Sequence, residues 1–379
     1  MKIMYVAPSF HPNQAPIMKG WVQNGDKVTF ISQYLGPTED HSYCSPIILG
    51  YSGLFVVLNR AYAWIQKRKR TRTAYPEAFQ NKCGFPPYFR LKKIIVQVRP
   101  DLVIVRERCL YSMVAYHICK VKNIPCILYN QTPLWDKTPP KTDVPHRIIK
   151  SLTPPLRMTP VYGDSKNGYL DPNAQYIPFV IEPKLNPENK VYFQNQEIHI
   201  LCVGKFEVRK HHLMLLDVFS RLERNYPLKL TLVGEVSTPN HQIYLKKVHE
   251  YIDRHNLHKK VDIHYNCKTG DMPLFYENAD LFVLPSTGEF ASVSQLEAMS
   301  YSLPVIVSDT NGTACYVENG ENGYLFRDKD VADLEAKITD MLRDLDRLKQ
   351  MGARSYELVQ TKYAFSGYMD KLKQLSQEK

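Results

Sequence analysis

The chain has 379 residues, of which 44% are hydrophobic and 23% are charged, a balance typical of a globular protein. At this length two domains are expected, because a single hydrophobic core seldom extends over so many residues. The sequence contains no uninterrupted run of about 18 apolar residues, which argues against a membrane-spanning helix.

Positive charge is concentrated in the first half. The whole chain has 49 Lys and Arg residues against 38 Asp and Glu, a formal charge of +11. Residues 1–180 carry 24 basic and 10 acidic residues, and the remainder is slightly acidic. Residues 60–99 alone hold 11 basic residues and one acidic residue, Glu77. This excess is a patch and is suited to an anionic partner.

The eight cysteines are scattered, with no Cys-x-x-Cys pair. Several of them (Cys109, Cys119, Cys126 and Cys202) fall inside predicted helices or strands, so we interpret them as buried thiols in a reducing compartment. The first residues have the pattern of a strand and no secretory cleavage site. We therefore predict a cytoplasmic protein.

The first half of the chain alternates predicted strands and helices. Short apolar runs bounded by turn residues predict buried parallel strands. These strands are expected at residues 3–7, 27–32, 101–105, 127–130 and 161–163, with a helix near 110–122.

One segment of this half, residues 51–72, has an apolar stripe at helical spacing that ends in a cluster of basic residues. A second basic and aromatic piece follows at 88–93. An amphipathic, aromatic and basic helix is typical of a segment that lies on an anionic membrane. Packing against the core remains an alternative, and nucleic-acid binding is less favoured because no recognition motif is present. The predicted patch comprises Trp64, Lys67, Arg68, Lys69, Arg70, Lys92 and Lys93.

A stretch rich in Pro and Asn near residues 178–196 indicates a linker. We therefore place a first domain at 1–180, the linker at 181–196 and a second domain at 197–355. Strands are expected in the second domain at 198–203, 228–233 and 261–265, and helices at 331–351 and 355–374. Residues 356–379 are expected to form the C-terminal helix.

Gly204 and Lys205 directly follow the strand at 198–203, and Lys210 comes five residues later. Two ammonium groups on one loop can neutralise the charge on a departing diphosphate without a metal. A solvated basic loop is the alternative interpretation.

Residues 281–309 predict a strand, a loop, a helix and a second strand. The loop carries Glu289 and the helix carries Glu297. If the helix begins near Ser292, both carboxylates can face one crevice, with the free amides of the first turn (Ser292, Val293 and Ser294) between them. This polarity suits a nucleotide sugar. Alternatively, Glu297 lies on an exposed helix face and Glu289 helps to start the helix.

Three blocks of sequence resemble family 4 retaining glycosyltransferases. They are Glu289 and Glu297 with seven residues between them, residues 321–326 (ENGYLF), and Val203-Gly204-Lys205 with Lys210. The blocks span about 130 residues of the carboxyl half, and the amino half matches only in its rhythm of elements. The resemblance implies the GT-B fold, in which two doubly wound Rossmann-like α/β domains face each other across a cleft and the last helix crosses back to the first domain.

The resemblance also implies a function. It is the retaining transfer of a sugar from a nucleotide diphosphate sugar (UDP or GDP type) to a lipid-linked or polysaccharide-precursor acceptor, on the inner face of the membrane and without metal or other cofactor. Lys205 and Lys210 would stabilise the leaving diphosphate, Glu297 would bind the ribose, and Glu289 would position the hexose. Gly204 and the start of the helix at Ser292–Ser294 would complete the donor site.

The sequence departs from the family pattern at several positions. The first loop lacks paired glycines, no His stands near Asn130, and Ser292 and His211 occupy positions where the family usually has Gly. These departures leave two alternatives open: a non-catalytic nucleotide-sugar-binding subunit, and a sugar-nucleotide 2-epimerase of the same fold. Asp328-Lys329-Asp330 has the spacing of a metal motif, but we interpret it as a helix cap.

Overall fold

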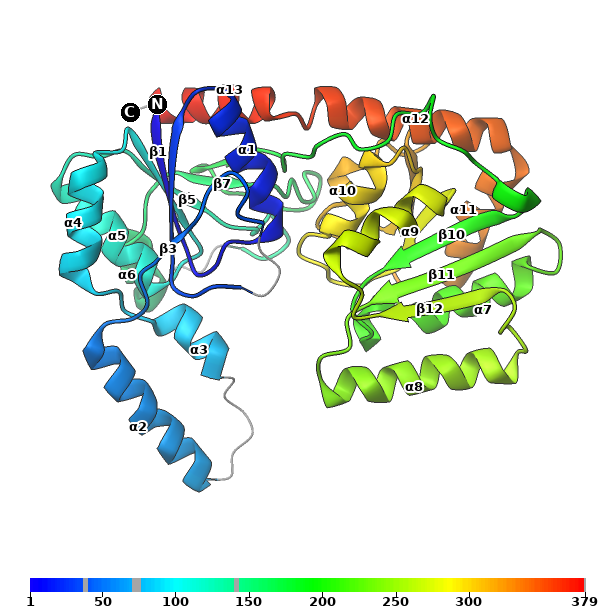
Figure 1. The fold of residues 1–379 in the computed structure, drawn as a ribbon, viewed down its shortest axis with the longest axis horizontal. Coiled ribbons are helices and arrows are strands. Elements are labelled where there is room, and N and C mark those ends of the chain that lie inside the picture. Colours follow the sequence, from blue (N-terminus) through cyan, green and yellow to red (C-terminus); the bar gives the residue numbers. More distant parts are fainter. Residues whose placement is uncertain (37–39, 70–75, 140–142, 378–379) are drawn as a thin grey trace. The chain divides into compact units, whose positions relative to one another are not determined.

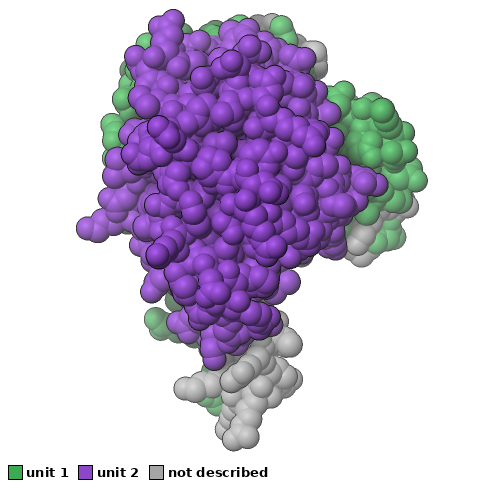
Figure 2. All heavy atoms as spheres, turned by 90° about the vertical axis from the view of Figure 1, so that its right-hand side faces the viewer, with its two compact units in different colours: residues 1–180, 365–379 green, residues 181–364 purple. Residues whose placement is uncertain are grey.

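The structure, a computed structural model, describes residues 1–36, 40–69, 76–139 and 143–377. Internal contacts divide the chain into two compact units, which Figure 2 colours separately. Unit 1 comprises residues 1–180 and 365–379, and unit 2 comprises residues 181–364. Each unit is built on its own parallel sheet (Figure 1).

Unit 1 contains a seven-stranded parallel sheet in the order β3-β2-β1-β4-β5-β7-β9. Alternate residues of β1 (Lys2–Ala7) enter two cores on opposite faces: Ile3 and Tyr5 pack on one side, and Met4 and Val6 on the other. Because helices cover both faces, the central strands β1, β4 and β5 are mostly apolar. The other strands are β2 (Lys27–Ser32), β3 (Ile47–Ile48), β4 (Leu102–Arg106), β5 (Cys126–Tyr129), β7 (Arg157–Thr159) and β9 (Ala174–Tyr176), and β6 (Trp135–Asp136) pairs with β8 (Tyr169–Leu170).

The C-terminal helix α13 (Phe365–Gln377) packs against α1 (Ala15–Gln23) within unit 1. The Trp21 indole donates to the Tyr5 hydroxyl at 2.8 Å, and the Tyr5 and Tyr368 hydroxyls lie 3.2 Å apart. A Cβ at Gly20 would come within 2.1 Å of the Phe365 ring, so a glycine is needed for this close approach. The remaining helices of unit 1 are α2 (Gly53–Lys69), α3 (Pro76–Cys83), α4 (Tyr88–Val98), α5 (Leu110–Val121) and α6 (Val144–Ser151).

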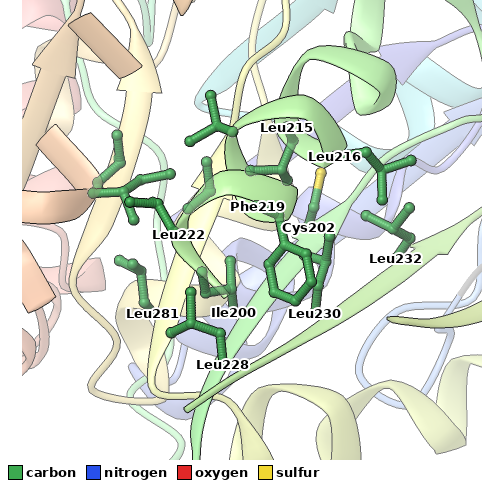
Figure 3. Close-up of a cluster of buried hydrophobic side chains, with 14 of the residues drawn as sticks. Ile200, Cys202, Leu215, Leu216, Phe219, Leu222, Leu228, Leu230, Leu232 and Leu281 are labelled. Atoms are coloured by element: carbon green, nitrogen blue, oxygen red, sulfur yellow. The ribbon is translucent and has the colours of Figure 1, made fainter. Parts of the chain in front are cut away.

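Unit 2 contains a six-stranded parallel sheet in the order β12-β11-β10-β13-β14-β15. Its largest core forms where α7 (His212–Leu222) packs on the sheet: Leu215, Leu216 and Phe219 contact side chains of β10 and β11 (Figure 3). The strands are β10 (Ile198–Val203), β11 (Leu228–Gly234), β12 (Val261–Tyr265), β13 (Leu281–Leu284), β14 (Val305–Ser308) and β15 (Gly323–Phe326). The other helices are α8 (Pro239–Arg254), α9 (Met272–Asn278), α10 (Val293–Ser300), α11 (Val331–Arg343) and α12 (Leu345–Thr361).

These two units confirm the predicted class of two doubly wound α/β domains. Most predicted strands lie within a residue or two of their expected bounds. The strand expected at 161–163 was wrong, because pairing with β5 and β9 occurs earlier, at Arg157–Thr159, and stops at Pro160. The single helix expected at 331–351 is two helices, because the Asp344 side chain accepts a hydrogen bond from the Arg347 amide and starts α12.

Residues 181–196, which we expected to form a linker, belong to unit 2. The Lys190 ammonium is buried and donates to the carbonyl oxygens of Tyr276 (2.9 Å) and Glu277 (2.6 Å). A segment rich in Pro and Asn is thus fixed by contacts that its composition does not indicate. Among the described helices, none has the length and apolar character needed to cross a membrane.

Candidate functional site

Three charged side chains from two loops of unit 2 meet in one cluster. Glu289, in the loop after β13, accepts hydrogen bonds from Lys210 Nζ and from Arg209 Nη1, the latter at 2.6 Å. Arg209 also contacts Glu207 at 2.7 Å. The side chains of Lys210 and Glu289 are 8% and 13% exposed, so this ion pair is largely shielded from water. The structure thus brings together two of the predicted catalytic residues, and it adds Arg209.

Gly204 lies against Lys210. A Cβ at position 204 would stand 3.2 to 3.5 Å from the outer atoms of the Lys210 side chain, so the glycine leaves room for the lysine to reach Glu289. Lys205 does not join this cluster. Its ammonium pairs with Glu235 at 3.0 Å, and both side chains are about half exposed. The two lysines therefore hold different carboxylates, a separation that their sequence spacing did not indicate.

A hydrogen-bonded chain supports the loop that carries Lys210. His211 Nε2 lies 2.7 Å from Thr287 Oγ1, and the Thr287 hydroxyl donates to Asp328 Oδ1 at 2.6 Å. Since a threonine hydroxyl has a single hydrogen, His211 Nε2 is the donor in the first bond. The Thr287 amide also donates to the Arg209 carbonyl oxygen at 2.8 Å. This chain connects the loops after β10, β13 and β15.

Sequence reasoning noted His211 only as a residue in place of glycine. Its φ of 52° is in the left-handed region, which glycine adopts more readily and which explains the usual preference at this position. Burial lowers the pKa of His211, whereas the nearby Asp328 carboxylate raises it. In the sequence, the one signal for these hydrogen bonds was a polar residue at a position that favours glycine.

The start of α10 is fixed to the end of β10. Ser292 is the N-cap residue, with extended φ and ψ, but its side chain makes no capping bond to the helix. Instead, Ser292 Oγ lies 3.0 Å from Ser294 Oγ, which donates to the Val203 carbonyl oxygen at 3.1 Å. The first amides of the helix, including that of Val293, have no capping side chain and are suited to an anion.

Glu297 lies farther along α10, on an exposed position. Its Oε2 accepts a hydrogen bond from the Tyr276 hydroxyl at 2.7 Å, and the Tyr276 ring stacks on Tyr301 with centroids 5.3 Å apart. Although the residue as a whole is exposed, desolvation of its carboxyl group by neighbouring protein raises the pKa of Glu297, while the Tyr276 bond and Lys184 act in the opposite direction. Among the described residues, no hydrogen bond or ion pair joins Glu297 to Glu289.

The Asp-Lys-Asp sequence at 328–330 has two separate roles. Asp330 caps α11, accepting from the Asp333 amide at 3.0 Å, which confirms the interpretation as a cap for this residue. Asp328 instead accepts from Thr287 and donates its amide to Asp309. Within the part of the chain that the structure describes, no group of three His, Cys, Asp or Glu side chains is arranged to hold a metal ion.

The basic patch predicted in the first half lies on two helices of unit 1. Trp64 on α2 is 58% exposed, and Lys93 on α4 is exposed, whereas Lys92 is partly buried. Arg70 lies outside the described residues, as do the side chains of Lys67, Arg68 and Lys69. A helix in the segment predicted at 51–72 is confirmed as α2 (Gly53–Lys69), with Phe55 buried.

Comparison with known proteins finds a family match over the segment that contains these site residues. Residues 186–358 match the family described as Glycosyl transferases group 1. A galactosyltransferase of Escherichia coli that acts on GlcNAc-diphosphoundecaprenol is 29% identical over 151 residues, which are 33% of this chain and 38% of that protein. The capsular polysaccharide biosynthesis glycosyltransferase CapM of Staphylococcus aureus is 25% identical over 225 residues, which are 58% of this chain and 55% of that protein.

Solved structures match over the whole chain. A glycosyltransferase from Rickettsia africae has a TM-score of 0.73 at 16% identity and covers 100% of this chain and 98% of its own. Anabaena HepE in complex with UDP has a TM-score of 0.71 at 14% identity, with full coverage of both chains. At these identities the likeness is one of fold. Residues 186–358 are therefore similar to the family described as Glycosyl transferases group 1, and each unit has the doubly wound α/β fold that the sequence resemblance predicted.

Proposed function

We propose that the protein is a retaining glycosyltransferase that moves a hexose from a nucleoside diphosphate sugar to a lipid-linked or polysaccharide-precursor acceptor. The observation that carries this proposal is the cluster of Arg209, Lys210 and Glu289, with a shielded Lys210–Glu289 pair, in the loops that lead to the uncapped start of α10. Cations and free backbone amides together suit a diphosphate, and an adjacent carboxylate suits sugar hydroxyls.

In this mechanism the main catalytic contribution is electrostatic stabilisation of the leaving group by positively charged side chains. Lys210, with Lys205 on the same loop, stabilises the negative charge that develops on the departing diphosphate, so the proposal requires no metal ion. Glu289 accepts hydrogen bonds from the hexose and Glu297 from the ribose. We assign no protein nucleophile, because front-face attack assisted by the leaving phosphate also retains configuration.

The proposal also includes the acceptor and the location of the protein in the cell. Two relatives, from Escherichia coli and Campylobacter jejuni, are named as acting on diphosphoundecaprenol-linked sugars. An acceptor of that kind is embedded in a bilayer, and the exposed apolar side chains of α2, including Trp64, suit an anionic membrane surface. We therefore propose a peripheral protein on the inner face of the membrane.

Thermal-shift measurements with UDP, GDP and ADP test the donor site first. The proposal expects one diphosphate to raise the melting temperature, with the increase lost in Lys210→Met and reduced in Glu297→Ala. No stabilisation by any of the three would contradict it. Arg327→Met, at an exposed position paired with Asp330 and Asp333, is the matched control for removal of a cation.

Product analysis separates the remaining functions. Incubation with the stabilising sugar nucleotide and a membrane extract should yield a glycosylated lipid and free nucleoside diphosphate. Conversion of the sugar nucleotide to another sugar nucleotide, without acceptor, indicates the 2-epimerase. Binding without turnover indicates the non-catalytic subunit. The sequence observations that favour this subunit are the altered first loop and the missing His.

A further inference from the structure

Two cations of different kinds hold the Glu289 carboxylate, and both contact the same oxygen, Oε2. Arg209 Nη1 donates to it at 2.6 Å from a side chain that is 43% exposed, whereas the Lys210 side chain is 8% exposed. Arg209 also pairs with Glu207, its Nη2 lying 2.7 Å from the carboxylate. An arginine presents its N–H groups in a rigid fork that can bridge two carboxylates, but a lysine is a point charge on a flexible stem. The two cations therefore differ in their freedom to leave Glu289.

The Lys210 ammonium has a single carboxylate partner, Glu289, among the residues that the structure describes. Two other titratable groups close to it are uncharged at neutral pH. Burial raises the pKa of the Cys202 thiol to about 12, and burial together with the Lys210 charge lowers the pKa of His212 to about 3. Because an unpaired buried charge is costly, this ammonium can leave its carboxylate only for another anion.

The proposed function asks the two members of this pair to separate. Lys210 is to neutralise a diphosphate and Glu289 is to bind the hexose, yet in the structure they neutralise each other. The outer part of the Lys210 side chain lies along Gly204, which has no side chain to obstruct a movement of the ammonium. Separation leaves Glu289, whose side chain is 13% exposed, without the lysine. A second cation is then needed to keep this carboxylate ionised and in place.

The main chain fixes Arg209 and Glu289 independently of the lysine ammonium. The Thr287 amide donates to the Arg209 carbonyl oxygen at 2.8 Å, which ties the loop after β13 to the main chain of Arg209. The Glu289 carbonyl oxygen accepts a hydrogen bond from the Gly312 amide at 2.7 Å. Neither bond involves the Lys210 side chain, so both persist when its ammonium moves. The contact between Arg209 and Glu289 therefore does not depend on Lys210.

We propose that Arg209 is a positioning residue that retains Glu289 when a diphosphate draws Lys210 away. In the free protein Glu289 occupies the lysine that the diphosphate needs. In the complex Arg209 holds the released carboxylate for the hexose hydroxyls. The identity of this diphosphate as that of a sugar donor rests on the proposed function, whereas the exchange itself requires only an anion that competes with Glu289 for Lys210.

Calorimetry with UDP, GDP, ADP and inorganic pyrophosphate tests the exchange, because it measures anion binding without turnover. Glu289→Gln removes the internal competitor and keeps the shape of the side chain. Kd for the diphosphate that binds should therefore fall about tenfold, the factor that corresponds to a hydrogen bond between charged groups. Arg209→Met should instead raise this Kd about threefold to fivefold, because Glu289 then bonds to Lys210 alone and holds it more firmly.

A double variant separates an indirect role of Arg209 from a direct one. If Arg209 acts through Glu289, adding Arg209→Met to Glu289→Gln should leave Kd within about twofold of Glu289→Gln alone. An Arg209 that contacts the diphosphate directly would weaken binding equally in both backgrounds, and that result would overturn the proposal. Arg209→Lys keeps the charge and loses the fork, so it should restore only part of the affinity lost in Arg209→Met.

Two matched controls remove a carboxylate and a cation elsewhere in unit 2. Glu235→Gln frees Lys205 from a pair in which both side chains are about half exposed, so Kd should change by at most about threefold. Arg327→Met removes a 73% exposed cation that is paired with Asp330 and Asp333, and it should leave Kd unchanged. Circular dichroism of every variant should match that of the wild type. Arg209→Met, at a half-exposed position, remains an independent test if Glu289→Gln unfolds.

Failure of this inference can be told from failure of the proposed function. If a diphosphate binds the wild type and Glu289→Gln does not bind it more tightly, the exchange is refuted and the donor site stands. If neither a nucleoside diphosphate nor pyrophosphate binds any variant, both are refuted. Tighter binding of pyrophosphate by Glu289→Gln, without transfer of any sugar, would refute the transferase and leave the exchange standing.

Discussion

Replacing Lys210 by Met gives the sharpest test of the cluster in unit 2. The substitution removes an ammonium group that is 8% exposed and keeps a side chain of similar length. Loss of one partner from a buried ion pair typically costs about 3–5 kcal/mol, because the other charge is left unpaired. Glu289 keeps its bond from Arg209 at 2.6 Å, however, so we expect a loss of only about 1–2 kcal/mol in the free energy of unfolding.

The effect on catalysis should be much larger than the effect on stability. A charged donor aimed at the leaving group contributes roughly 10²–10³ in kcat, and a methionine cannot replace it. Transfer kinetics at saturating donor, together with urea unfolding, measure the two quantities separately. Lys205→Met is the matched variant: its half-exposed pair with Glu235 contributes little to stability, so it should lower turnover without a measurable change in unfolding.

Two outcomes would contradict this reasoning. A Lys210→Met protein with turnover close to that of the wild type would remove the diphosphate role. A loss of stability as large as that of a fully broken buried pair would mean that Arg209 does not hold Glu289.

Three further predictions concern neighbouring groups. His211→Gly should leave the unfolding free energy within about 1 kcal/mol of the wild type, because relief of the left-handed φ offsets the lost bond to Thr287. Turnover of this variant should nevertheless fall. His211→Asn should partly restore turnover. Burial, reinforced by the nearby Lys210 charge, lowers the pKa of His212 to about 3, so below about pH 6.5 the unfolded chain binds a proton that the folded chain does not. Stability should therefore fall by about 1.4 kcal/mol per pH unit as the pH drops below that value, and acid titration of His212→Leu should show this slope reduced by one proton. Tyr276→Phe removes a donor that lowers the pKa of Glu297, so more of this carboxyl group is protonated at mildly acidic pH in the variant. Calorimetry should therefore show nucleotide binding weakened most at mildly acidic pH. An equal loss at all pH values would contradict the role of this hydrogen bond.

Much of the fold follows from local patterns in the chain. Apolar runs such as β13 and β14 are buried on both faces, and a run of this kind has few alternatives to a central parallel strand. The helix between them follows from Leu296 and Met299 at helical spacing. The paired glutamates eight residues apart lie on that same local unit, which is why the sequence alone allowed both to be predicted as donor-site residues.

Tertiary structure alone decided which partner each charged group has. Glu289 meets Arg209 and Lys210, about 80 residues away in sequence, and Lys205 turns instead to Glu235. Periodicity assigns a side chain to a face of its own element, but the neighbour across that face depends on the order in which parallel strands assemble. The same holds for α6 (Val144–Ser151), a helix that the sequence analysis does not predict and whose Val144 and Ile148 side chains are exposed.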